Sequence, residues 1–186
     1  GDIEKFPFLD PPKPSMIREG LKELLELGAI RHVEKNENGT VERIISLTDT
    51  GKKLARIPIQ PRLAKIMLTA SELAALPSAL PVVASLSCDD PRRRPQDEKE
   101  RADQAHAQFN VDGSDFLGTL KLWNWWEEQS NALSQNQLRK LAQKTFLAYS
   151  KMREWRDTVH QLTTLSKRLG LDIQNDNGGS DSLHRA

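Results

Sequence analysis

Basic side chains are concentrated in one stretch of this sequence, residues 137–170. Its eight lysines and arginines are accompanied by only two acidic residues, Glu154 and Asp157. Residues three and four apart share one face of a helix, which would bring Arg153 and Arg156 together. Such a row can contact the phosphates of a nucleic-acid strand, but solvated helix faces are also commonly charged, and both interpretations stay open. The basic residues are Arg139, Lys140, Lys144, Lys151, Arg153, Arg156, Lys167 and Arg168.

Three of the four tryptophans lie in the segment 114–129. Exposed rings can stack on nucleic-acid bases, whereas buried rings belong to a core. On a helical projection Trp123 and Trp126 fall on the apolar arc, while Trp125 falls on the opposite side. We therefore predict that Trp123 and Trp126 are core residues and that Trp125 is a surface ring, facing nucleic acid or a neighbouring domain.

The sequence offers no catalytic constellation. It contains neither the phosphate-binding motif G-x-x-x-x-G-K-[ST] nor the nucleophile motif G-x-S-x-G. Its single cysteine, Cys88, excludes an intramolecular disulfide, and the two aspartates that follow it disfavour a thiolate nucleophile. The four histidines are scattered without metal-ligand spacing. We expect no catalytic residue, no metal site and no cofactor in this chain.

The overall charge and hydropathy give no sign of a membrane. The formal net charge is +1, so any basic surface must be local. Apolar runs are broken well short of the roughly 20 residues that a membrane span needs, and the opening residues GDIEKFPF lack the apolar run of a signal peptide. We predict a cytoplasmic, monomeric protein that does not contact a membrane.

The first third of the chain predicts a winged helix. Residues 1–14 contain three prolines near their end and form a linker. Ser15 is placed as the N-cap of a helix that ends at Gly28. A hairpin follows, with strands over 29–33 and 41–47 and a type I′ turn at Asn38-Gly39.

Seven further helices are predicted, with Thr48, Ser114 and Ser134 as N-caps. They cover 48–56, 61–73, 78–86, 96–108, a tryptophan helix from 114, a short helix from 134 and a long helix from Thr145 to Gly170. The fold is therefore mainly α with a small β-hairpin. Its parts are the linker 1–14, a winged helix 15–72, a helical bundle 73–172 and a disordered tail 173–186.

Two charged segments have alternative interpretations. In a DNA-binding winged helix the helix before the hairpin is usually basic, but Arg18 and Lys22 are outnumbered here by three glutamates. Packing is therefore favoured over DNA binding for this helix. The arginines Arg92, Arg93 and Arg94 can grip phosphates or pair locally with Asp89, Asp90 and Asp97.

Six phrases, in order, resemble the helicase-associated C-terminal region of DEAH-box RNA helicases, most closely the bacterial HrpA type. They span roughly residues 6–170. The phrases are FPFLDPP at 6–12, LLELGAI at 24–30, LTDTGKKLARIPIQPRLAKIML at 47–68, DDPRRRP at 89–95, SDFL at 114–117 and FLAYSKMREWRD at 146–157.

This resemblance implies a winged helix and a ratchet-like helical domain, cut from a longer ATP-dependent RNA helicase. Two RecA-like motor domains of the same polypeptide would bind ATP and Mg²⁺, while this chain, lacking a P-loop and a DEAH motif, would be inactive alone. The ratchet-like domain would form one wall of a channel for single-stranded RNA. The RNA-binding candidates are Lys144, Lys151, Arg153, Arg156 and Trp125, and the candidates for interdomain packing are Phe6, Phe8, Arg92 and Arg94.

The sequence also departs from the family pattern. Gln60 stands where relatives have an aspartate before Pro-Arg-Leu, so the helix at Pro61 loses a carboxylate cap. Ser150 stands where many eukaryotic relatives have an arginine, and the hairpin turn over 34–40 is longer than usual. Two other functions remain open: a stand-alone winged-helix DNA-binding regulator and a protein-docking module.

Overall fold

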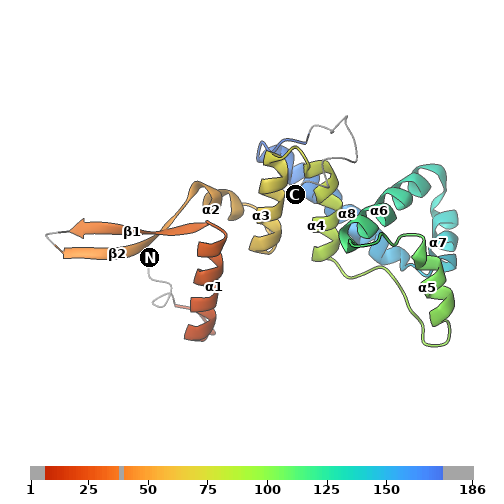
Figure 1. The fold of residues 1–186 in the computed structure, drawn as a ribbon, viewed down its shortest axis with the longest axis horizontal. Helices are drawn as coiled ribbons and strands as arrows, with labels where there is room; N and C mark the ends of the chain where they lie inside the picture. Colours follow the sequence, from red (N-terminus) through yellow and green to blue (C-terminus); the bar gives the residue numbers. More distant parts are fainter. Residues whose placement is uncertain (1–6, 38–39, 174–186) are drawn as a thin grey trace. The chain divides into compact units, whose positions relative to one another are not determined.

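A computed structural model of the protein describes residues 7–37 and 40–173 (Figure 1). Phe6, the predicted turn at Asn38-Gly39 and the predicted tail from residue 174 lie outside these ranges. The chain divides into two compact units, Gly1–Lys65 and Ile66–Ala186. This division falls inside helix α3 (Pro61–Glu72).

Unit 1 has the element order predicted for a winged helix. Helix α1 (Pro14–Glu26) precedes strands β1 (Ile30–Glu37) and β2 (Thr40–Leu47), and α2 (Asp49–Leu54) follows. The strands pair antiparallel from Ile30↔Leu47 to Glu37↔Thr40. Most of the stretch 34–40, predicted as a long turn, is therefore part of the paired hairpin.

Helix α1 begins earlier than predicted. Its N-cap is Lys13, so Ser15 lies inside the first turn and the prediction of Ser15 as N-cap is wrong. Proline is well suited to the first helical position, because its fixed φ is helical and its missing N–H has no partner there anyway. Pro14 takes that position, and the cap residue Lys13 makes no side-chain hydrogen bond, because its ammonium group has no acceptor.

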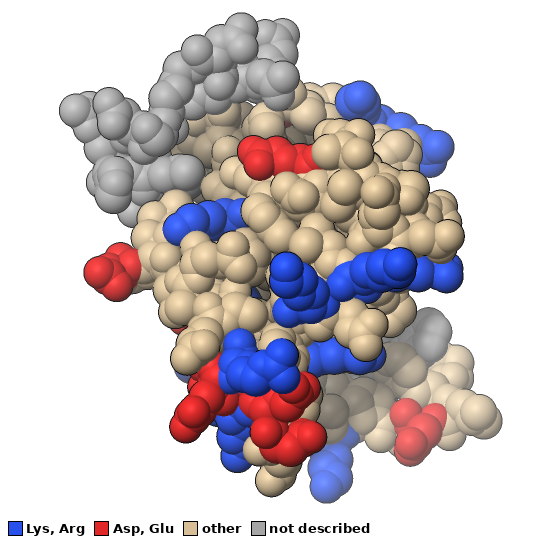
Figure 2. All heavy atoms as spheres, turned by 90° about the vertical axis from the view of Figure 1, so that its right-hand side faces the viewer, with Lys and Arg blue, Asp and Glu red and all other residues tan. Residues whose placement is uncertain are grey.

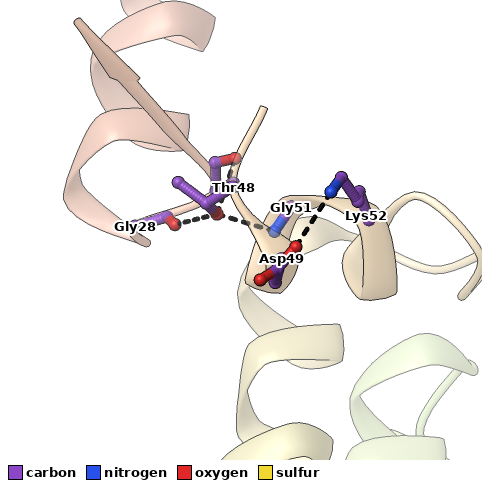
Figure 3. A network of polar contacts seen from close by, with 6 residues as sticks. Gly28, Thr48, Asp49, Gly51 and Lys52 are labelled. Atoms are coloured by element: carbon purple, nitrogen blue, oxygen red, sulfur yellow. Dashed lines mark hydrogen bonds and ion pairs between the residues drawn. The ribbon is translucent and has the colours of Figure 1, made fainter. Parts of the chain in front are cut away.

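Thr48 joins the end of β2 to the start of α2, as Figure 3 shows. Its Oγ1 donates to the Gly28 carbonyl at 2.6 Å and accepts from the Gly51 N–H at 3.0 Å. The prediction of Thr48 as an N-cap is thus confirmed. Lys52 donates to the Asp49 carboxylate at 2.9 Å, and this hydrogen bond lowers the pKa of Asp49.

Helices are the main elements of the described part of unit 2, and the predicted fold class, mainly α with a small β-hairpin, is confirmed. Helix α4 packs against α6 and α8, and α7 packs against the same two helices (Figure 1). The helices are α4 (Leu76–Ser87), α5 (Lys99–Ala107), α6 (Asp115–Ala132), α7 (Gln135–Lys144) and α8 (Tyr149–Arg168).

Trp155 of α8 anchors the core of unit 2. Its side chain is 1% exposed, and its Nε1 donates to the Pro81 carbonyl of α4 at 2.8 Å. A buried indole N–H needs such a partner, because leaving it unpaired would cost about 1–3 kcal/mol. Met152, Leu122 and Phe109 are also fully buried.

The long helix predicted from Thr145 begins four residues later, at Tyr149. Thr145 Oγ1 donates back to the Leu141 carbonyl at 2.8 Å, so this residue closes α7 instead of starting α8. Phe146 then takes a left-handed conformation with φ 54°, which interrupts any helix. The basic residues of α7 and α8 therefore do not lie on one continuous helix.

The tryptophan helix α6 buries its rings unequally. Trp126 is 1% exposed, as predicted. Trp123 is half-buried and lies 5.2 Å from the Trp155 ring, whereas Trp125 is half-buried and lies 5.1 Å from the Phe109 ring. Trp125 therefore covers a buried residue with part of its surface.

We predict that Gly51→Ala disrupts unit 1. A Cβ at this position would lie 2.0 Å from the Ala29 carbonyl oxygen, a backbone atom that can yield only if β1 shifts. We expect a loss of stability of about 2 kcal/mol or more and faster amide hydrogen exchange in β1 and β2. Gly20→Ala is the matched control: a Cβ there meets nothing within 4 Å, so it should stabilise α1 by about 0.5–1 kcal/mol. If both changes altered the free energy of unfolding equally, the close approach of Gly51 to the Ala29 carbonyl would be contradicted.

We also predict that Trp126→Ala is much more destabilising than Trp125→Ala. The first change empties a fully buried site and should cost about 3–5 kcal/mol in urea unfolding. The second removes a half-buried ring that covers Phe109 and should cost less than half as much. Similar costs would show that Trp125 is a core residue in the same sense as Trp126.

Candidate nucleic-acid interface

The cations predicted to contact nucleic acid differ in the partners that the fold gives them. Arg156 on α8 pairs with Glu127 of α6, its Nε lying 3.0 Å from Oε1. That oxygen is buried, and the arginine side chain is about half exposed. This ion pair joins two packed helices, so much of the charge of Arg156 is balanced within the fold.

Lys151, in the first turn of α8, is held by the loop that follows α4. Its Nζ lies 3.2 Å from the Asp89 carboxylate and donates to the Asp90 carbonyl at 3.4 Å. Its side chain is 39% exposed, so one side of the ammonium remains open to solvent. Lys151 thus has a structural partner but keeps some capacity for a second contact.

Arg153 and Lys144 are exposed, and neither side chain has an ion pair or hydrogen bond within the described part of the chain. Arg153 lines a shallow groove on α8 together with the acidic Glu154 and Asp157, which weaken its local positive potential. Lys144 is the last residue of α7, a helix that contains no acidic residue. These two side chains are the predicted RNA contacts that the fold leaves unpaired.

The loop of three arginines is bound to the break between α7 and α8. Arg92 forms an isolated β-bridge with Leu147, and the Arg93 N–H donates to the Phe146 carbonyl at 2.8 Å. The Arg92 guanidinium lies 3.7 Å from the Asp90 carboxylate. Of the two interpretations of this loop, local pairing therefore applies to Arg92.

Arg94 pairs with a residue that sequence reasoning missed. Its Nε and Nη2 donate to the two carboxylate oxygens of Asp103 at 2.8 and 2.6 Å. These hydrogen bonds lower the pKa of Asp103. Asp103 lies on α5, nine residues away in the sequence and beyond the aspartates that flank the loop, and no local spacing rule indicates this contact.

Phe109 is a second residue that the sequence analysis missed. It follows a polar helix and precedes a turn, yet it is only 2% exposed. The one signal for it is Gly118, the fourth residue of α6, where a Cβ would lie 2.9 Å from the Phe109 carbonyl oxygen. A glycine inside a helix often marks a close backbone approach.

A cavity of about 300 Å³ lies where the end of α4, the loop after it, α6 and α8 meet. It is lined in part by Cys88, Arg92 and Trp155. The Cys88 thiol shares a hydrogen bond with Thr158 Oγ1 at 3.3 Å, and the lining also includes Asp90, whose carboxylate lies 3.7 Å from the Arg92 guanidinium.

In unit 1 the acidic side of α1 faces a basic residue of α3. Arg62 Nε lies 2.7 Å from Glu23 Oε1, and its Nη2 lies 3.8 Å from Glu26. Phe8, predicted to pack on another domain, is 38% exposed in this structure. Within the described ranges no group of three or more metal-ligating side chains is found, and no helix is long and apolar enough to cross a membrane.

Comparison of the sequence with known proteins identifies its family. The profile of the helicase-associated domain (HA2), ratchet-like, matches residues 60–156. The ATP-dependent RNA helicase HrpA homolog of Haemophilus influenzae is 38% identical over 185 residues, and HrpA of Escherichia coli is 36% identical over 186 residues. Each alignment covers 100% of this chain but 14% of the relative.

A more distant relative is the pre-mRNA-splicing factor ATP-dependent RNA helicase prp22 of Schizosaccharomyces pombe. It is 31% identical over 126 residues, which are 68% of this chain and 10% of that protein. The chain thus spans only a small part of the relatives that it matches. Because the family profile covers more than half of its residues, the chain belongs to the ratchet-like helicase-associated domain (HA2) family, as the six phrases in its sequence predicted.

Proposed function

We propose that this chain is the accessory C-terminal part of an ATP-dependent RNA helicase and that its unit 2 forms one wall of a channel for single-stranded RNA. The relatives that align over the whole chain are named as ATP-dependent RNA helicases, which supports this assignment. The observation that carries the RNA contact is the presence of exposed, unpaired cations at Arg153 and Lys144.

The chemistry of the parent protein would reside in its RecA-like motor domains. Those domains would bind ATP and Mg²⁺, and this chain would pack against them in the same polypeptide. Phe8, Arg92 and Arg94 are the described residues proposed for that packing. This chain would position RNA and have no reaction of its own, in a monomeric cytoplasmic protein.

The structure suggests different roles for the proposed RNA contacts. Arg153 and Lys144 are free to meet phosphates directly. Lys151 and Arg156 are already paired with Asp89 and Glu127, so each would contact RNA while keeping its ion pair. Trp125 has part of its ring against Phe109 and offers the remainder for stacking.

The two other functions are less well supported. A DNA-binding regulator would need a basic helix before the hairpin, and α1 instead presents glutamates, two of which contact Arg62. A docking module would not need the unpaired cations of unit 2. Its salt dependence would also differ, because phosphate contacts release counterions and give a steep dependence of affinity on salt.

We predict that Arg153→Glu in the full-length protein weakens binding of single-stranded RNA about fivefold or more. The plot of log affinity against log salt should become shallower by about 0.7, the value for one lost phosphate contact on a single strand. Basal ATP hydrolysis should stay close to that of the wild type. Arg168→Glu, the same change near the end of the same helix, is the control. RNA affinity that does not change in Arg153→Glu would refute the assignment of this face to the channel.

Arg156 requires a separate test, because its substitution also breaks the ion pair with Glu127. We predict that Arg156→Glu lowers stability by about 1–2 kcal/mol, since two carboxylates would then face each other at a partly buried site. The double variant Arg156→Glu, Glu127→Arg should recover most of that loss in thermal unfolding. If the double variant is stable but still binds RNA weakly, Arg156 contacts RNA; if it binds normally, Arg156 is structural.

A further inference from the structure

Helix α7 carries the most uncompensated positive charge of unit 2. Three of its ten residues, Arg139, Lys140 and Lys144, are basic and none is acidic. All three are exposed, and no ion pair reaches them within the described ranges of the chain. Figure 2 shows lysine and arginine side chains on the face of the molecule that carries α7.

The three cations share one side of the helix. At 3.6 residues per turn, Lys140 and Lys144 are separated by about 40° around the axis, and Arg139 brings the whole set to an arc of about 140°. By contrast, two of the predicted contacts on α8, Lys151 and Arg156, are paired with carboxylates. Arg153 of α8 is unpaired as well, but Glu154 and Asp157 lie beside it, whereas the three cations of α7 have no acidic residue on their own helix.

Arg139 is also held in a defined position. The centre of its guanidinium lies 5.4 Å from the centroid of the Tyr149 ring at the start of α8. Tyr149 in turn meets the buried Trp126 edge to face, with ring centroids 6.3 Å apart. The tyrosine thus rests on the core and supports an exposed guanidinium. A planar guanidinium fixed on an aromatic ring is a surface on which a nucleobase can stack.

We propose that α7 and Tyr149 form a contact site for single-stranded RNA, in which a base stacks on the pair Arg139–Tyr149 and Lys140 and Lys144 meet the phosphates. This inference rests on the proposed function and adds to it the residues that bind base and backbone. A duplex is a poor ligand, because its bases are already stacked on each other. An acidic peptide without aromatic residues would satisfy the lysines but has no ring for the platform.

The test uses fluorescence anisotropy of the 186-residue chain with a labelled oligouridylate and with an abasic oligonucleotide of the same length, at several salt concentrations. Arg139→Lys keeps the charge and removes the planar group. It should weaken binding of the oligouridylate about fivefold or more and remove most of its advantage over the abasic strand. The double variant Lys140→Gln, Lys144→Gln should reduce the salt slope by about 1.4, corresponding to two phosphate contacts.

The double variant Lys53→Gln, Arg56→Gln, which removes two positive charges at exposed positions of unit 1, controls for net charge, and circular dichroism confirms that each variant is folded. If Arg139→Lys binds like the wild type and still distinguishes the abasic strand, the inference is overturned while the proposed function stands through Arg153. If the wild-type chain and the full-length protein both fail to bind RNA, the proposed function itself fails. Equal sensitivity of duplex or acidic-peptide binding to Arg139→Lys would also overturn the inference.

Discussion

The architecture of unit 2 depends on one backbone pairing, between the loop after α4 and the break between α7 and α8. The Ala148 N–H donates to the Pro91 carbonyl at 2.8 Å, and the Arg93 N–H donates to the Phe146 carbonyl at the same distance. These bonds satisfy polar groups of two irregular segments that would otherwise lack partners. They also place Tyr149, the first residue of α8, where Arg139 of α7 can lie over its ring.

The break itself is strained and is stabilised by its neighbours. Phe146 has φ 54°, a conformation that costs a bulky residue of the order of 1 kcal/mol or more. Its carbonyl is shared by the Arg93 N–H and by His106 Nε2, which lies 3.2 Å away, and Arg101 lies over its ring at 5.8 Å. Because contacts from the loop and from α5 all act on this residue, the chain reverses there and α7 is separated from α8.

Local signals in the sequence predicted the elements that depend on local chemistry. Ser114 accepts a hydrogen bond from the Leu117 N–H at 3.3 Å, and the Ser134 N–H donates to Gln137 Oε1 at 2.9 Å, so both predicted helix starts are confirmed. Features that depend on distant partners were not predictable. Phe109 is buried by contact with α6, and Arg94 selects Asp103 over nearer aspartates, because the fold brings these groups together.

Charge counts along a sequence therefore do not identify a binding face by themselves. The excess of positive charge over residues 137–170 is real, but Asp89 and Glu127, both outside that stretch, neutralise two of its members. A buried or partly buried carboxylate is most costly when it is unpaired, so the packing of α6 against α8 itself selects Arg156 as a structural residue. Helix α7 has no acidic residue, and no carboxylate from another described element pairs with its cations. Their charge is therefore available to bind a polyanion. The cations available to a polyanion are thus those that the fold does not pair with a carboxylate. Which cations these are can be seen only in the packed structure.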